Sequence, residues 1–168
     1  MQLLGHSRRS APTRAFTLVE IMVVVVIIGL LAAAAVPTYR HITLRAKATA
    51  IVTDLRAYSA VFLNHNMTKG AWPASTLPGV VPAEVVDTIQ SGFTKPTPIG
   101  GYYEWDHDNS ANGFPVTAAI SIVTANGSPV TDDLDLLEMI DGLIDDGNLE
   151  TGSVRLTATH NFVYILEQ

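Results

Sequence analysis

The chain has 168 residues, no cysteine, 10 basic and 16 acidic residues, and a formal net charge of −6. The lack of cysteine excludes a disulfide framework, a thiolate metal site and a cysteine nucleophile. Residues 16–168 hold 7 of the basic and all 16 acidic residues, a balance of 7 − 16 = −9, which argues against direct nucleic-acid binding because that binding needs lysine and arginine to neutralise phosphates.

Residues 16–37 form an apolar segment after a short basic leader, and Glu20 is the one charged residue within it. As a helix, these residues span about 33 Å at ~1.5 Å per residue, close to the ~30 Å hydrocarbon core of a bilayer. An ionisable side chain at the centre of such a helix costs about 3 kcal/mol, so an intramembrane carboxylate indicates a functional site. Cleavage between Ala15 and Phe16 would create an α-amino group that could pair with Glu20, in the same chain or in a neighbouring copy.

The run Ala15-Phe16-Thr-Leu-Val-Glu20 resembles the processing and methylation signal of type IV prepilins and type II secretion pseudopilins. The resemblance covers about the first third of the chain. It implies that prepilin peptidase cleaves after Ala15 and N-methylates Phe16, that Glu20 registers subunits during assembly, and that Pro37 kinks the helix. The family usually has glycine before the cleaved bond, where this chain has Ala15.

The same resemblance implies the domain organisation, the location and the partners. Residues 1–15 are then a leader, 16–37 a transmembrane segment and 38–168 a pilin-like globular head. The leader arginines keep the N-terminus in the cytoplasm, which places a single-pass protein in a bacterial inner membrane with a periplasmic head. The implied partners are the lipid bilayer, further copies or other pilin-like subunits, prepilin peptidase and an inner-membrane assembly platform. The alternative interpretation of the segment is an ordinary secretory signal peptide or signal anchor.

An apolar stripe with helical spacing continues beyond Pro37 and predicts one long helix that ends near Gly70. The stripe consists of Leu44, Ala48, Ile51, Leu55, Tyr58 and Phe62. Because proline removes one backbone donor, Pro37 inside this pattern predicts a kink and not an end.

The rest of the chain predicts strands at 100–106, 114–123, 153–159 and 162–166, with a tight turn at His160-Asn161. A second helix is predicted over 131–147, with Thr131 as its N-cap and most of its acidic residues explained by the helix ends. The fold class is therefore α+β: a long N-terminal helix, its first half transmembrane, packed on a small antiparallel sheet.

Oxygen-bearing side chains alternate at Asp106, Asp108 and Asn112, as ligands do in calcium loops. An EF-hand is excluded, because its sixth and twelfth positions would be Ala111 and Thr117. Two interpretations stay open here: a less regular calcium loop, or a turn that joins two strands.

No arrangement typical of catalysis occurs: the five histidines are scattered, and there is no nucleophile elbow or phosphate-binding glycine loop. We therefore predict a non-enzymatic structural subunit or assembly component of a type IV pilus or type II secretion pseudopilus, without a cofactor. The alternatives are a low-copy minor subunit at the filament tip, and a membrane-anchored domain that binds calcium or another ligand without forming filaments.

Overall fold

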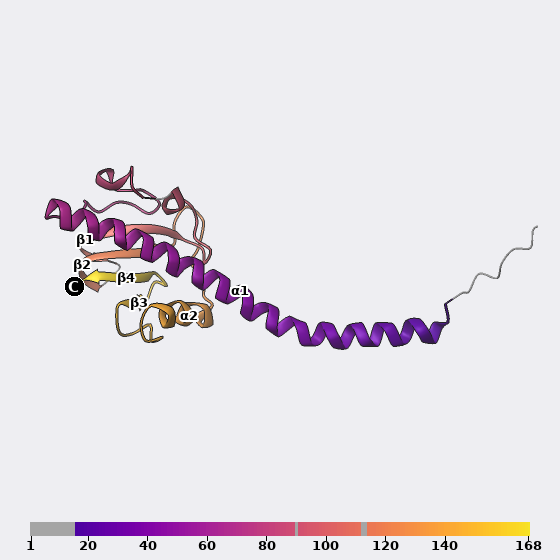
Figure 1. Ribbon diagram of the computed structural model, residues 1–168. Coiled ribbons are helices and arrows are strands. Elements are labelled where there is room, and N and C mark those ends of the chain that lie inside the picture. Colours follow the sequence, from indigo (N-terminus) through magenta and orange to yellow (C-terminus); the bar gives the residue numbers. More distant parts are fainter. Residues whose placement is uncertain (1–15, 90, 112–113) are drawn as a thin grey trace, which may run out of the picture. The chain divides into compact units, whose positions relative to one another are not determined.

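The computed structural model describes residues 16–89, 91–111 and 114–168 (Figure 1). The chain divides into two compact units between Arg40 and His41, and helix α1 (Leu18–Lys69) contributes residues to both. The predicted leader lies outside the described residues. The elements after α1 are η1 (Ala83–Val85), η2 (Ser91–Thr94), β1 (Tyr102–Ala111), β2 (Phe114–Val123), α2 (Leu134–Ile144), β3 (Val154–Leu156) and β4 (Phe162–Glu167).

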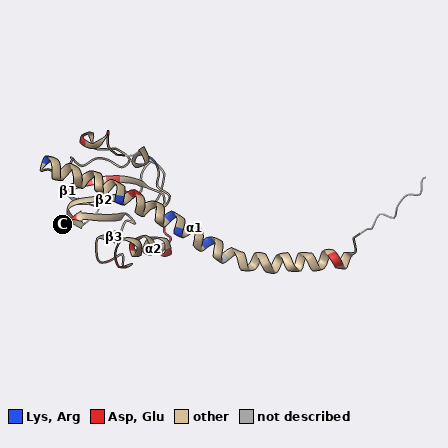
Figure 2. Ribbon diagram, viewed as in Figure 1, with Lys and Arg blue, Asp and Glu red and all other residues tan. Residues whose placement is uncertain are grey.

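In the first unit, the apolar part of α1 is exposed along its whole length. Every residue from Phe16 to Val36 is exposed, and the mean hydropathy of the most apolar stretch of the helix is 2.9. Figure 2 shows this part of the ribbon without basic residues and with one acidic position near its start. By length and composition, the helix can cross a membrane.

In the second unit, the predicted apolar stripe of α1 is confirmed. Ala48, Ile51, Leu55, Tyr58 and Phe62 are buried in one core cluster, and Leu44 packs against it. The helix ends where the sequence predicts, because Gly70 takes a left-handed conformation (φ 73°) and its N–H donates to the Asn66 carbonyl at 2.7 Å.

The head contains one antiparallel sheet with the strand order β1-β2-β4-β3 (Figure 1). The register pairs Trp105 with Ile120, Ile120 with Tyr164, and Val154 with Tyr164. One face of this sheet and the buried side of α2 share the core with the stripe of α1. The predicted α+β class, a long helix on a small antiparallel sheet, is confirmed.

An aromatic cluster at the centre of the core fixes α1 to β1. The rings of Phe62 and Trp105 stack with centroids 3.8 Å apart, and Tyr58 meets Phe93 and Tyr103 edge-on at 5.2 Å and 5.0 Å. Trp105 Nε1–H donates to the Pro73 carbonyl at 3.0 Å. The connecting region after α1 is thereby held against β1.

Several predicted boundaries differ from the structure. Strand β1 runs on to Ala111, so the polar residues from 106 onward belong to a strand and not to a loop. Five residues, 157–161, connect β3 to β4, where a two-residue turn was predicted. The Thr157 N–H donates to the Asn161 carbonyl at 2.9 Å and closes this longer loop. Helix α2 begins after Asp133 instead of Thr131, since the Thr131 hydroxyl accepts the Asp133 N–H outside the helix.

Candidate functional site

The beginning of α1 is organised by Thr17. Its Oγ1 accepts the N–H of Glu20 at 3.2 Å, and its carbonyl accepts the N–H of Ile21 at 3.3 Å. These are the bonds of a helix N-cap, and Thr17-Leu-Val-Glu20 has the T-x-x-E spacing of a capping box. This role of Thr17 was not predicted, although the T-x-x-E spacing is visible in the sequence.

The residues predicted for processing and assembly surround this cap. Phe16 precedes it and is 74% exposed. Glu20 is exposed in the first turn of α1, where the positive end of the helix dipole favours a carboxylate. Ala15 lies outside the described residues. Cleavage before Phe16, its methylation and the assembly role of Glu20 therefore stay predictions.

Pro37 lies within α1, whose helical assignment runs from Leu18 to Lys69. The helix thus continues past the proline, as the apolar pattern predicts. A kink at this position stays a prediction.

The candidate calcium ligands of the β1 region lie in different environments. Asp106 is buried on β1, and its Oδ2 accepts the Ser121 hydroxyl at 2.9 Å. Burial raises the pKa of Asp106, and the Ser121 hydrogen bond opposes that rise. Asp108 is exposed, with His107 Nε2 at 3.5 Å from its carboxylate. Asn112 lies outside the described residues, and a cation at these three positions stays a prediction.

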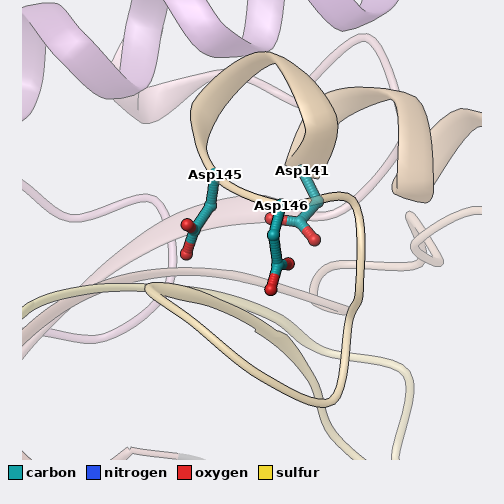
Figure 3. Close-up of side chains that lie close together, drawn as sticks. All are labelled: Asp141, Asp145 and Asp146. Carbon is teal, nitrogen blue, oxygen red and sulfur yellow. The ribbon is translucent and has the colours of Figure 1, made fainter.

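A second acidic cluster, which was not predicted from the sequence, lies where α2 ends. Asp141, Asp145 and Asp146 each offer a carboxylate oxygen, and the three oxygens lie within 4.8 Å of one another. Figure 3 shows the side chains projecting to the same side from the last turn of α2 and the residues after it. The four-residue spacing of Asp141 and Asp145 places both on one helix face and was the signal available in the sequence.

The three carboxylates differ in burial and bonding. Asp145 accepts the Ser153 N–H, and Asp146 accepts the Asn148 N–H at 2.9 Å and the Thr151 hydroxyl at 3.0 Å. Asp141 is 0% exposed, and neither of its carboxylate oxygens has a hydrogen-bond partner.

Several effects act on the charge of Asp141. Burial, together with the charges of Asp146 and Asp145, raises its pKa to about 6. The nearby Gly147 N–H lies outside hydrogen-bond geometry and opposes this rise only in part. Ionisation of Asp141 therefore lowers the stability of the folded head.

A family model described as the prokaryotic N-terminal methylation motif matches residues 11–36. The matched residues include the predicted cleavage position, Phe16 and Glu20. The motif ends before the head begins, so it describes the apolar segment and its approach and not the sheet.

Similar proteins extend the likeness beyond the motif. Over 67 residues, the chain is 33% identical to a type IV major pilin protein of Neisseria gonorrhoeae, covering 40% of this chain and 31% of the relative. Over 68 residues, it is 38% identical to a fimbrial protein of Pseudomonas aeruginosa, covering 38% and 44%. The chain thus matches less than half the length of these curated relatives.

A solved structure has a similar fold. The structure of the major type IV pilin from Clostridium difficile superposes with a TM-score of 0.52 at 17% identity, covering 74% of this chain and 97% of that one. The similarity supports the architecture of a long helix on a small antiparallel sheet.

Proposed function

We propose that the chain is a structural subunit of a type IV pilus or of a related pseudopilus, because it matches the N-terminal methylation motif and shares the fold of a type IV pilin. The observation that carries this proposal is the stretch from Phe16 to Val36, where every residue is exposed and Glu20 alone is charged. An apolar helix surface of this extent is stable only in lipid or against other apolar helices. A filament subunit uses both environments in turn.

We infer that prepilin peptidase removes residues 1–15 and methylates Phe16, at the cytoplasmic face of a bacterial inner membrane. The head then lies in the periplasm, and the spanning helix stores the subunit in the bilayer. During assembly, contacts between helices replace contacts with lipid. A platform protein in the membrane would deliver the subunits.

In this proposal, Glu20 selects the position of each subunit relative to its neighbour. A carboxylate among apolar side chains loses hydration and gains little unless a positive group approaches it. The α-amino group of Phe16 from a neighbouring copy supplies that charge. The N-cap at Thr17 holds the start of the helix, and with it the spacing between Phe16 and Glu20.

The test compares processing and assembly in one cell background. Intact-mass analysis of the native protein should find a chain that begins at N-methylated Phe16. The Glu20→Ala variant should be processed normally and stay in membranes, with a loss of at least tenfold from the sheared filament fraction. Glu138→Ala is the matched control, because Glu138 is an exposed acid on α2, and its assembly should be normal.

Other results would change the proposal in defined ways. A chain that keeps residues 1–15, or one cut near Ala35, would contradict peptidase processing and leave an anchored or secreted domain. Normal assembly of the Glu20→Ala variant would remove the proposed role of Glu20. Correct processing with only a few copies at a filament end would support the minor-subunit alternative. None of these roles requires catalysis, and we propose that the protein is not an enzyme.

A further inference from the structure

We propose that Asp141, Asp145 and Asp146 bind a calcium ion between the end of α2 and the start of β3. The site lies wholly in the head, and its chemistry does not depend on the filament role proposed above. Figure 3 shows the three side chains that would provide the ligands. Each contributes a carboxylate oxygen, and these oxygens already lie within 4.8 Å of one another.

The buried, unpartnered carboxylate of Asp141 indicates a bound ligand. It is 0% exposed, both of its oxygens lack a hydrogen-bond partner, and it is directed toward two further carboxylates. Buried carboxylates are ordinarily paired, hydrogen-bonded or bound to metal, because an uncompensated one loses its hydration without replacement. A cation at the meeting point of the three side chains supplies what Asp141 lacks.

The basic side chains near this region are directed elsewhere. Arg56 donates to the Leu143 carbonyl at 3.0 Å, and Arg155 donates to the Gly152 carbonyl at 3.3 Å. Within the described residues, no ion pair joins a lysine, arginine or histidine to any of the three aspartates. The protein therefore brings three negative charges together without a positive side chain bound to them.

Asp141, Asp145 and Asp146 lie at the C-terminal end of α2. The C-terminal end of a helix carries a partial negative charge, which disfavours carboxylates and favours cations. Helix α2 has no basic residue in its last turn, and Asp145 is its C-cap. An acidic cluster explained by helix dipoles belongs at the other end, where Asp132, Asp133 and Asp135 lie.

The ligand chemistry selects calcium among common cations. All three groups are hard oxygen donors, and no histidine or cysteine belongs to the cluster. Calcium binds oxygens at about 2.3–2.6 Å, so two of its ligands can lie up to about 5 Å apart. Magnesium binds at about 2.0–2.1 Å, which limits that separation to about 4 Å. Oxygens within 4.8 Å of one another fit the calcium range, and a cluster of three carboxylates exceeds the one or two that usually hold magnesium.

Calcium at this place would tie three segments together. Asp141 belongs to α2, Asp145 accepts the Ser153 N–H just before β3, and Asp146 anchors the intervening loop through Asn148 and Thr151. The chain has no cysteine, so a disulfide cannot fasten this loop. Bound calcium would stabilise the connection between α2 and the last two strands of the sheet.

The experiment uses the full chain in detergent micelles after chelator treatment and buffer exchange. Calcium and magnesium are titrated by calorimetry, and thermal unfolding is followed by tryptophan fluorescence. We expect a calcium Kd of about 0.1–1 mM, the range of extracellular calcium modules, and weaker magnesium binding. At calcium about twentyfold above Kd, the Tm should rise by roughly 5 °C.

Two variants and a matched control locate the site. Asp141→Asn should weaken calcium binding by at least tenfold and raise the Tm of the calcium-free protein, because it removes an uncompensated charge. Asp146→Asn tests the same site at an exposed position, which keeps the measurement available if Asp141→Asn does not fold. Asp132→Asn removes one charge at the other end of α2 and should keep the Kd within twofold.

The proposal would be overturned by either of two results. The wild-type Tm could be insensitive to calcium up to about 10 mM, well above the Kd range of extracellular modules. Alternatively, Asp141→Asn and Asp146→Asn could bind calcium as tightly as Asp132→Asn, which would indicate weak association with the acidic surface as a whole. Both results leave the processing and Glu20 experiments unaffected, so the two proposals fail independently.

Discussion

Two stretches of the same helix, residues 18–36 and 41–62 of α1, differ in whether the chain itself buries their apolar side chains. Ile28 in the first stretch is 59% exposed, whereas Ile51 in the second is 0% exposed. The first stretch is apolar on every side, and its only charged residue is Glu20. The second is apolar on one face, and that face packs on the sheet of the same chain.

The difference shows that two parts of one helix can depend on different surroundings for the burial of their apolar side chains. The second stretch is complete within the chain, since its core partners come from β1, β2, β4 and α2. The side chains of the first stretch are exposed, and under the proposed function lipid or other chains bury them. Stability of the head and formation of a filament should therefore respond to mutations in different halves of one helix.

The largest expected effect comes from one substitution placed in each stretch. Ile51→Ala removes a fully buried side chain and should lower the free energy of unfolding of the head by about 2–5 kcal/mol. Ile28→Ala should leave that free energy within about 0.5 kcal/mol, because the Ile28 side chain is 59% exposed and lies outside the core of the head. Chemical denaturation of both variants in micelles, followed by tryptophan fluorescence, measures the difference.

An assembly assay supplies the opposite comparison for the same pair. Ile28→Ala should reduce recovery of sheared filaments while the head stays fully stable. Equal destabilisation of the head by both variants would contradict the conclusion that only the second stretch of α1 contributes to the stability of the head.

Alkaline pH should unfold the head and spare the apolar stretch. Burial, with a smaller effect of the Asp54 charge, raises the pKa of Tyr58 to about 12, and burial with the Asp54 contacts raises the pKa of Tyr103 further. The folded head therefore holds protons that the unfolded chain releases near the usual value of 10.0. Its stability should be unchanged below about pH 10 and fall from there through pH 12, by up to about 1.4 kcal/mol per pH unit for each tyrosine.

Circular dichroism during the alkaline titration separates the two stretches. Residues 16–36 contain no tyrosine, so helicity from that stretch should persist in micelles after the near-ultraviolet signal of the head is lost. Tyr103→Phe should make the fall in stability less steep. Simultaneous loss of both signals would show that the stretches unfold as one unit.

The helix and its buried face could be predicted from the sequence because both follow a local period. Spacings of three and four residues from Leu44 to Phe62 admit one helix and one buried side. The apolar stretch could also be predicted, because 22 residues with one charged side chain are typical of a helix that spans a membrane. The run from Ala15 to Glu20 indicated the family, and the methylation motif and the pilin-like fold bear that out.

Features that depend on contacts between distant residues could not be predicted. The extension of β1 to Ala111 depends on pairing with β2, and the burial of Asp106 depends on Ser121 across that pair. The acidic cluster was hidden because Asp141 resembles an ordinary polar position on an amphipathic helix. Its burial becomes visible only when the chain from Asp145 to Ser153 folds back beside α2.

A smaller effect is expected from two tyrosines in the aromatic core of the head. Tyr103 Oη–H donates to Asp54 at 3.1 Å, so Tyr103→Phe should cost about 1–2 kcal/mol at neutral pH. The Tyr58 hydroxyl is buried without a partner, so Tyr58→Phe should be neutral or stabilising by up to about 1 kcal/mol. Urea denaturation of the pair measures this difference, and an equal loss in both variants would contradict it.

The smallest effect is expected at Asp106, the other buried aspartate of the head. Its carboxylate accepts the Ser121 hydroxyl at 2.9 Å, and asparagine can accept the same bond. Asp106→Asn should therefore change the free energy of unfolding by less than about 1 kcal/mol. Because burial raises the pKa of Asp106, wild-type stability should fall as pH rises above 3.8, and the variant should lack that contribution.

Asp106→Asn also distinguishes the two places where the head could hold a cation. Asp106 already has a hydrogen-bond partner, whereas Asp141 has none, so the calcium-induced rise in Tm should persist in Asp106→Asn and disappear in Asp141→Asn. The opposite pattern would place calcium at the candidate ligands Asp106, Asp108 and Asn112. Ile28→Ala should leave the calcium response intact in either case, since the head folds around partners that the chain itself supplies.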